Sequence, residues 1–322
     1  MAARAAILGV SGLRLTSDER ALFRATPPMG AILFRRNVET PAQLRALTAE
    51  LREVLGEQAP ILVDQEGGRV ARLRPPHWPA FPPMAAFEGR DAAAAEANGA
   101  LIGLACREAG FDVACAPVLD LRLPGAHDII GDRSPSADPV EVARIGAALL
   151  RGLHAAGVQG VIKHIPGHGR ALVDSHEALP RVTASAAELA ADIAPFAALA
   201  GAGAWAMTAH ILYDAWDAER PATLSPVVIG RVIRGEIGFQ GPLLSDDLAM
   251  KALSGNYAAL AEAAIAAGCD AVLHCPGDGA GNAAVLARCP VLSDVARARF
   301  DAARAALRPV ALAAARLAAV RD

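Results

Sequence analysis

The sequence lacks both a charge imbalance and a cysteine framework, and these two absences exclude several classes of protein. Its 322 residues include 31 Lys and Arg against 34 Asp and Glu, which gives a formal net charge of −3. Without a basic stripe, a nucleic-acid partner has no electrostatic support. The five cysteines are odd in number and none has Cys-x-x-Cys spacing, so we expect no disulfide framework and no structural zinc site. A reducing, cytoplasmic location fits this pattern.

The sequence also lacks a segment that we expect to cross a membrane. Its mean hydropathy of +0.31 reflects a high alanine content. The longest uncharged stretch, Ile193–Tyr213, has about the length of a membrane span. One proline, two glycines and a histidine interrupt it, and it divides into a helix end, a turn and a strand. The N-terminal apolar run contains two glycines and no cleavage site, so it is typical of a first strand rather than a secretion signal.

Short apolar runs that end in polar or glycine residues recur along the chain. They are rich in Val, Ile and Leu, as buried β-strands are, and segments with helical signals separate them. With 53% hydrophobic residues the chain can bury a large core, which excludes a disordered protein. The eight predicted strands are Ala6–Val10, Ala31–Phe34, Ile61–Val63, Val113–Leu119, Val161–Lys163, Trp205–Ala209, Leu243–Ser245 and Ala271–Leu273.

The intervening segments carry signals for helix starts and ends. Leucines at three- and four-residue spacing form one stripe on the first of four predicted helices, and Pro139 suits the first turn of the second. Ser225 is a candidate N-cap for the third, and Gly238 is suited to end it in a left-handed conformation. The predicted helices are Pro41–Leu55, Val140–His154, Pro226–Ile237 and Leu292–Asp322.

The alternation of strand and helix predicts a single α/β domain over residues 1–322. Each return to a parallel strand needs a crossover, and eight such units close into a (β/α)8 TIM-type barrel. The competing fold is a doubly wound open sheet. Its nucleotide-binding form requires Gly-x-Gly-x-x-Gly after the first strand, and the residues after Gly9 do not supply it. The sequence therefore favours the barrel.

Most predicted strands run directly into an ionisable residue. The active site of a barrel lies at the carboxyl ends of its strands, so we expect these side chains to converge on one cavity. A single Asp or His in such a position is more often a helix cap or a loop residue, but six such positions together favour a site. They are Asp64, Asp120, Lys163–His164, His210, Asp246–Asp247 and His274.

The segment Lys163–Gly169 (KHIPGHG) has the densest polar pattern. His164 and His168 are four residues apart, a spacing that places two metal ligands on one face of a helix. Pro166 and the two glycines forbid a helix here, so a metal site is not favoured. A phosphate-binding loop is not favoured either, because no Lys-Ser or Lys-Thr follows. We expect no cofactor.

Two further patterns point to acid/base and carboxylate chemistry. Asp174 and His176 are two residues apart, so in extended chain on a mobile loop the carboxylate can orient the imidazole for general acid/base catalysis. Spacing alone fits an inert loop histidine equally well. Asp246 and Asp247 close the seventh strand, where only one of them can point into the mouth, and spacing does not decide which. A carboxylate opposite a proton donor cleaves glycosidic bonds with retention.

Taken together, these segments resemble glycoside hydrolase family 3, and within it the bacterial β-N-acetylglucosaminidases of cell-wall recycling. Several long motifs in order carry the resemblance from about the first strand to the eighth. They are Asp64–Arg72 (DQEGGRVAR), Ala116–Asp120 (APVLD), Ile130–Ser134 (IGDRS), Lys163–Gly169 with Asp174–His176, and Ser245–Leu248 (SDDL). The chain departs from the family pattern at Ile165, Pro135 and His274–Pro276.

The resemblance implies roles for individual residues. Asp246 corresponds to the nucleophile, and His176, paired with Asp174, corresponds to the acid/base. The positions implied to bind the terminal N-acetylglucosamine are Asp64, Arg72, Arg133, Lys163 and His164. Asp and Arg supply the charged, bidentate hydrogen bonds that sugar hydroxyls favour.

The expected function is therefore a retaining exo-β-N-acetylglucosaminidase. The expected substrate carries N-acetylglucosamine on 1,6-anhydro-N-acetylmuramic acid with a peptide, and the expected partner is this carbohydrate alone. Three alternatives stay open: phosphorolysis, since a neutral histidine does not repel phosphate; β-glucosidase activity; and a non-catalytic sugar-binding barrel. The sequence leaves the oligomeric state open.

Overall fold

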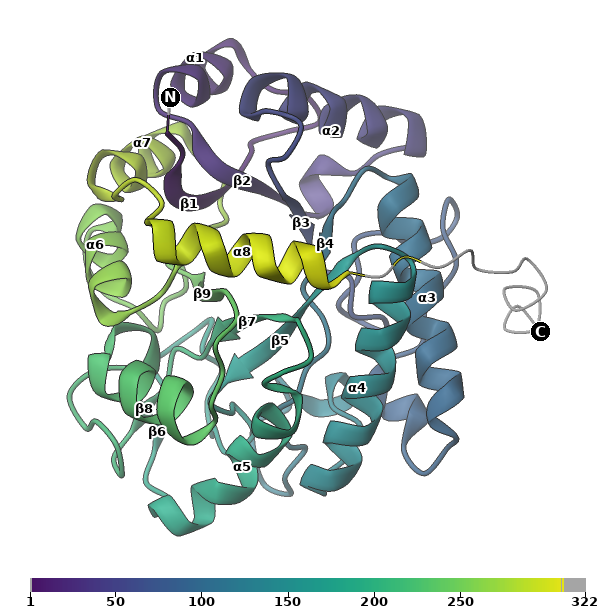
Figure 1. The fold of residues 1–322 in the computed structure, drawn as a ribbon, viewed down its shortest axis with the longest axis vertical. Coiled ribbons are helices and arrows are strands. Elements are labelled where there is room, and N and C mark those ends of the chain that lie inside the picture. Colours follow the sequence, from purple (N-terminus) through teal and green to yellow (C-terminus); the bar gives the residue numbers. More distant parts are fainter. Residues whose placement is uncertain (1, 308, 310–322) are drawn as a thin grey trace.

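Eight parallel strands close into a barrel in the computed structural model, which describes residues 2–307 and 309 (Figure 1). Each barrel strand pairs with the next one along the chain, and the last returns to the first. The predicted (β/α)8 fold is thus confirmed. The barrel strands among the described residues are β1 (Arg4–Gly9), β2 (Pro28–Leu33), β3 (Ile61–Val63), β4 (Val113–Ala114), β5 (Gln159–Ile165), β7 (Trp205–Thr208), β9 (Leu243–Asp247) and β10 (Ala271–His274).

Helices cover the outside of the barrel (Figure 1). The helices predicted at Pro41–Leu55 and Val140–His154 are confirmed. Thr40 and Asp138 are their N-caps, directly before Pro41 and Pro139. The helices are α1 (Ser17–Ala25), α2 (Pro41–Leu55), α3 (Ala92–Glu108), α4 (Pro139–Ala155), α5 (Ala186–Leu199), α6 (Tyr257–Ala267), α7 (Gly279–Arg288) and α8 (Asp294–Ala306), with the short η1 (Arg35–Asn37), η2 (Met84–Phe87), η3 (Gly131–Arg133), η4 (Ala222–Leu224) and the longer η5 (Val228–Glu236).

Two predicted helices differ from the structure. The segment predicted as Pro226–Ile237 is mainly η5, a π-helix; Ser225 Oγ does accept a hydrogen bond from the N–H of Val228 at 3.0 Å, and Gly238 follows with φ of +73°. The segment predicted as Leu292–Asp322 begins later, at Asp294, because Ser293 caps it, and it ends at Ala306. The rest of that prediction, residues 308 and 310–322, lies outside the described residues.

The predicted strand Val113–Leu119 is too long, because β4 ends at Ala114. The N–H of Ala116 donates to the carbonyl of Ala114 at 2.8 Å instead of to a neighbouring strand, and Pro117 has no N–H to donate. Beyond Ala114, contact with β5 consists of the Val161 N–H donating to the carbonyl of Ala116 at 2.9 Å and an isolated bridge between Val118 and Lys163. The chain therefore leaves the regular ladder just before it delivers Asp120.

A small second sheet was not predicted. In it, β6 (Arg181–Val182) pairs in parallel with β8 (Leu212–Tyr213). Strands of two residues are too short to carry an alternating pattern, which is why the sequence gives no signal for them. This sheet connects the segment after β5 with the segment after β7.

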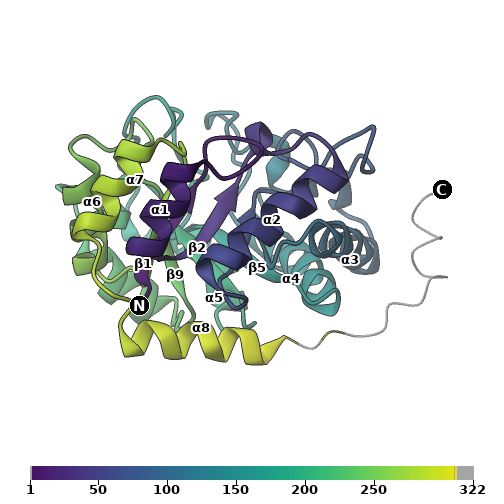
Figure 2. The same cartoon turned by 90° about the horizontal axis from the view of Figure 1, so that it is seen from above.

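Helix α8 lies across the end of the barrel where the strands begin (Figure 2). There the rings of Trp205, which opens β7, and Phe300 of α8 meet edge to face at 4.7 Å between centroids. This end is closed by packing, so the opposite end is left for a site. No helix within the described residues has the length and apolar character needed to cross a membrane.

The apolar stripe of α2 provides a test of the packing. Leu47 is fully buried, whereas Arg45 on the same helix is exposed. We expect Leu47→Ala to lower the free energy of unfolding by about 2–5 kcal/mol, because it leaves a cavity in the core. Arg45→Ala is the matched control and should change it by less than about 0.5 kcal/mol. Chemical denaturation followed by circular dichroism measures both; equal effects would contradict the observed orientation of α2.

Candidate active site

A cavity of about 540 Å³ opens at the carboxyl ends of the barrel strands. Seven of the eight predicted site residues line it; the eighth, Asp174, stands beside His176, which does. The seven are Asp64, Arg72, Arg133, Lys163, His164, His176 and Asp246.

The prediction that all the strand-end residues converge on this cavity is correct only in part. Asp120, His210 and His274 do not line it and are fully buried. His210 contacts Thr223 and the carbonyl of Asp247, and His274 contacts Asn282 of α7. These residues follow their strands as predicted, but their side chains are buried in the protein interior and do not line the cavity.

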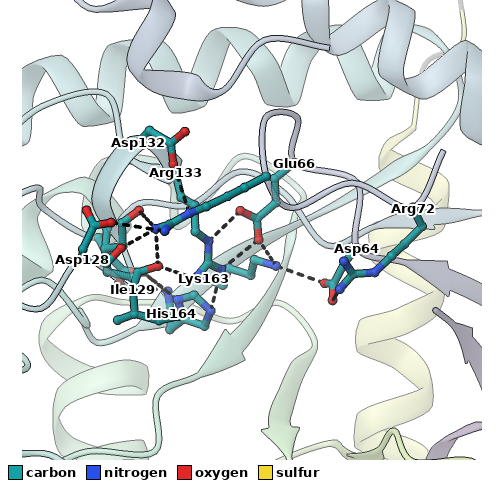
Figure 3. A network of polar contacts seen from close by, with 12 residues as sticks. Asp64, Glu66, Arg72, Asp128, Ile129, Asp132, Arg133, Lys163 and His164 are labelled. Carbon is teal, nitrogen blue, oxygen red and sulfur yellow. Dashed lines mark hydrogen bonds and ion pairs between the residues drawn. The ribbon is translucent and has the colours of Figure 1, made fainter. Parts of the chain in front are cut away.

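A chain of alternating charges crosses the floor of the cavity (Figure 3). Arg72 donates to Asp64 at 2.9 Å, and the Lys163 ammonium donates to the other oxygen of Asp64 at 3.2 Å. The same ammonium lies 2.6 Å from Glu66, and Arg133 holds Glu66 with two bonds of 2.8 and 2.9 Å. Each buried charge in the chain has a partner of opposite sign.

This pairing keeps the groups ionised although they are buried. Burial acts to raise the pKa of Glu66, but the opposing effect of Arg133 and Lys163 is larger and lowers the pKa to about 2. For Asp64, Lys163 and Arg72 likewise outweigh burial and hold the pKa below its ordinary value. Burial acts to lower the pKa of Lys163, yet Asp64 and Glu66 raise it above the ordinary value. The cavity floor therefore presents fixed charges at neutral pH.

Glu66 is a site residue that the sequence reasoning did not single out. It lies two residues after Asp64 in the DQEGGRVAR motif, and alternate residues of an extended segment share a face. That spacing was the available signal. Glu66 contacts two residues that are predicted to bind the sugar, and its side chain is 3% exposed. It therefore holds those binding residues in place.

The segment that carries Arg133 is held by a second arginine. Arg69 contacts Asp132 at 3.1 Å and donates to the carbonyl of Ile129 at 3.0 Å, and Arg133 donates to the same carbonyl at 3.1 Å. The loop before η3 is therefore fixed from two sides (Figure 3). This places the Arg133 guanidinium against the cavity.

His164 is oriented by the buried carboxylate of Asp120. Its Nδ1 lies 2.7 Å from Asp120 Oδ2, its N–H donates to Asp120 Oδ1 at 3.1 Å, and its Nε2 lies 3.5 Å from Arg133. Burial acts to raise the pKa of Asp120, but His164 and the backbone N–H of His168 hold it below the ordinary value. The carboxylate thus fixes the ring, leaving Nε2 on the cavity side.

The two aspartates at the end of β9 have different surroundings. Asp247 Oδ1 accepts from the N–H groups of Ala249 and Cys275, both at 3.0 Å, and burial raises its pKa. Asp246 Oδ1 accepts from the N–H of Asp247 at 2.8 Å. Burial acts to raise the pKa of Asp246, but His164 and His210 hold it below the ordinary value. Asp246 is therefore the better candidate for a carboxylate that is ionised at neutral pH.

Asp174 and His176 meet as the spacing predicted. His176 Nδ1 lies 2.8 Å from Asp174 Oδ1, which also accepts the backbone N–H of His176 at 2.8 Å. The contact holds the ring proton on Nδ1 and leaves Nε2 free. The His176 side chain is 57% exposed, and it lines the same cavity as Asp246.

His164 and His168 are close but turn their nitrogens toward different partners. Their ring centroids are 5.6 Å apart, and His168 Nε2 lies 3.0 Å from Ser175 Oγ while His164 Nδ1 faces Asp120. Within the described part of the chain, no group of three His, Cys, Asp or Glu side chains is arranged to hold a metal ion.

Comparison with known proteins decides the family. The family described as glycosyl hydrolase family 3 N-terminal domain matches residues 7–305. The chain belongs to glycosyl hydrolase family 3. The resemblance inferred from the motifs is confirmed, and with it the enzyme class, a glycoside hydrolase of the β-N-acetylhexosaminidase type.

Individual relatives agree over most of the chain. The β-hexosaminidase of Alkalilimnicola ehrlichii is 43% identical over 84% of this chain and 80% of its own length, and that of Pseudomonas aeruginosa is 40% identical over 84% and 81%. The crystal structure of NagZ from Neisseria gonorrhoeae in complex with N-trifluoroacetyl-D-glucosamine is 31% identical, covers 100% of this chain and 94% of that one, and has a TM-score of 0.85.

The charge chain predicts an acid-dependent loss of stability to which Glu66 contributes. Its pKa is lowered from 4.5 to about 2 in the fold, so ionised Glu66 stabilises the fold above the unfolded value, and this contribution is lost as the pH falls toward the folded value. We expect Glu66→Gln to lower the free energy of unfolding by about 3 kcal/mol at pH 7, and by progressively less in acid. Urea denaturation across pH measures the difference; Glu177→Gln, an exposed carboxylate, is the control.

Proposed function

We propose that the protein is a retaining exo-β-N-acetylglucosaminidase that removes terminal N-acetylglucosamine through a covalent glycosyl-enzyme. One observation carries the proposal. Asp246 and His176, which is paired with Asp174, line the same cavity, and Asp64 and Lys163 form part of its charged floor. A carboxylate and a proton donor on one sugar-sized cavity are the components that retaining hydrolysis requires.

The charged floor is suited to hold the terminal sugar. Asp64, Arg72, Arg133, Lys163 and His164 are the residues proposed to hydrogen-bond the hydroxyl groups and the acetamido group. Their mutual ion pairs fix the donors before the substrate arrives, so little conformational entropy is lost on binding. Burial excludes competing water and strengthens each of these hydrogen bonds.

In the first step, an Asp246 oxygen attacks the anomeric carbon and forms the glycosyl ester. The bond from that carbon to the leaving oxygen breaks, and the proton on His176 Nε2 moves to the leaving group. The lowered pKa of Asp246 supports its ionised state, and Asp174 stabilises the imidazolium that donates this proton.

In the second step, the now neutral His176 takes a proton from water through Nε2. The resulting hydroxide equivalent attacks the anomeric carbon, and the ester bond to Asp246 breaks, which releases the sugar with its original configuration. The imidazole returns to the protonated state that begins the next cycle. General acid/base assistance of this kind contributes about 10²–10⁴-fold in rate.

The proposed substrate is N-acetylglucosamine linked to 1,6-anhydro-N-acetylmuramic acid with a peptide, as released in cell-wall recycling. The bacterial relatives named β-hexosaminidase and the Neisseria protein bound to a glucosamine derivative support the donor sugar. A single catalytic domain over residues 1–322 acting in the cytoplasm belongs to the same proposal, in which neither nucleic acid nor membrane is a partner.

The nucleophile assignment predicts which aspartate is labelled. A 5-fluoro-N-acetylglucosaminyl fluoride should form a stable ester on Asp246, because the fluorine at C5 slows both steps while the fluoride leaving group keeps the first step fast enough to occur. We expect Asp246→Asn to lower hydrolysis of a β-aryl N-acetylglucosaminide by about 10³-fold or more and to abolish labelling. Peptide mass spectrometry locates the label; its appearance on Asp247 would overturn the assignment.

Product analysis tests the substrate and the type of transfer together. We expect turnover of the β-aryl N-acetylglucosaminide and of the anhydromuramoyl disaccharide, with at least about tenfold lower kcat/KM for the matching glucoside. Proton NMR should show β-N-acetylglucosamine as the first product with or without phosphate. Accumulation of the sugar 1-phosphate only with phosphate would instead identify a phosphorylase, for which the histidine acid/base is also suitable.

A further inference from the structure

We propose that His168 and Ser175 form a positioning pair that sets the location of the acid/base His176 relative to the sugar-binding floor. The inference rests on the proposed function. It gives a role to His168, the second histidine of the KHIPGHG segment, which takes no part in the two hydrolytic steps. Neither residue lines the cavity, so both act through the residues next to Ser175.

Ser175 is the buried centre of an exposed turn. It lies between Asp174 and His176, whose side chains are 23% and 57% exposed, yet it is itself only 2% exposed. Its Oγ lies 3.0 Å from Nε2 of His168, which is 3% exposed. A buried hydrogen bond therefore anchors the residue between the two that are proposed to move the proton.

The protonation state of His168 makes this bond directional. Burial, with the charge of His164, lowers its pKa to about 4, so the ring is neutral at physiological pH. Its Nδ1 is buried and has no hydrogen-bond partner among the described residues. Unpaired buried N–H groups are rarer than unpaired acceptors, so we assign the proton to Nε2, which then donates to Ser175 Oγ.

The other end of His168 is fixed to Asp120. The backbone N–H of His168 donates to Asp120 Oδ1 at 2.6 Å, and Asp120 also fixes the His164 ring through Nδ1 at 2.7 Å. One buried carboxylate thus holds a sugar-binding residue and, through His168 and Ser175, the turn that carries His176. The pair therefore places the proton donor relative to the bound sugar.

Further contacts restrain the same segment without touching the acid/base pair. Tyr213 donates to the carbonyl of Gly167 at 2.7 Å, and the N–H of Ala252 donates to the carbonyl of Ser175 at 3.2 Å. In contrast, the Glu177–Lys251 pair on the same turn is about two-thirds exposed on both sides. Exposed pairs of this kind contribute little, so Glu177 provides a matched control.

Loss of the anchor should affect proton transfer and leave sugar binding intact. Ser175→Ala removes the hydrogen bond with the smallest change in volume, and His168→Leu removes it from the other side. His168→Gln keeps an N–H donor near the position of Nε2 and should restore part of the activity. If the His168 variants fail to fold, as thermal unfolding will show, Ser175→Ala carries the test alone.

Leaving-group dependence separates positioning from a general structural defect. For a phenyl N-acetylglucosaminide, whose leaving group needs protonation, we expect Ser175→Ala to lower kcat/KM about tenfold. For the 2,4-dinitrophenyl glycoside, which departs without a proton, kcat/KM should fall less than about twofold. The inhibition constant of N-acetylglucosamine should not change, and Ser175→Ala combined with His168→Leu should lose no more than either alone.

Equal losses on both aryl glycosides, a weakened inhibition constant, or full activity of Ser175→Ala would each overturn the inference. Glu177→Gln should match the unmodified protein on both substrates. The failure of the inference is distinguishable from that of the proposed function. If only the inference is wrong, the unmodified protein still hydrolyses the β-aryl N-acetylglucosaminides and Asp246→Asn and His176→Ala lose that activity. If the function is wrong, the unmodified protein itself fails to hydrolyse them or forms the sugar 1-phosphate when phosphate is present.

Discussion

The buried ammonium of Lys163 is the charge around which the rest of the cavity floor is arranged. Its side chain is 3% exposed, and a charge removed from water to that degree costs several kcal/mol unless partners compensate it. Asp64 and Glu66 do so. The Glu66 side chain is 3% exposed and that of Asp64 is 19% exposed, and each contacts a further cation, Arg133 and Arg72 respectively. Because the charges alternate along the chain, each side chain can keep its ion pairs with both neighbours in only one position. The groups proposed to bind the sugar are therefore held in place by the requirement that no buried charge be left unpaired.

The barrel supplies the geometry that this compensation needs. Parallel strands bring their carboxyl ends to one rim, so residues separated by 99 positions in the chain, Asp64 and Lys163, come within hydrogen-bond distance. Helix α8 packs across the other rim, where the rings of Trp205 and Phe300 meet and Arg299 of α8 contacts the buried Asp270 at 2.7 Å. The early end of β4 contributes to the site. Because β4 leaves the ladder at Ala114, Asp120 lies outside regular pairing, and its carboxylate accepts N–H groups from His164 in β5 and from His168 just after it.

The sequence predicted the parts of this structure that repeat and missed those that depend on a single contact. Periodicity located the barrel strands and α2, because a buried stripe must recur at the spacing of its element. It overestimated β4, where Pro117 interrupts pairing, and it gave no sign of the two-residue strands β6 and β8 or of the π-helical form of η5. The motifs identified the cavity residues and the Asp174–His176 contact. They did not identify Glu66 as the partner of Lys163 and Arg133, nor Asp120 as the partner of His164, since pairing between distant segments has no local pattern. The choice between Asp246 and Asp247 likewise required the surroundings of both carboxylates.

The site divides into two parts with opposite physical requirements. Residues that bind a sugar gain from rigidity, and those proposed to do so here lie in the ion-paired floor. A residue that gives a proton to the leaving group and takes one back from the attacking water must be reachable by that water, and the most exposed of the predicted catalytic side chains is His176. Exposure alone would leave that imidazole free to adopt many positions, and proton transfer tolerates little displacement. A buried neighbour meets both requirements. Ser175 fixes the backbone of the turn while the His176 ring stays open to water. Ser175 is connected through His168 to Asp120, the same carboxylate that orients His164. Under this arrangement the accuracy of the exposed acid/base comes from a residue that never contacts the substrate.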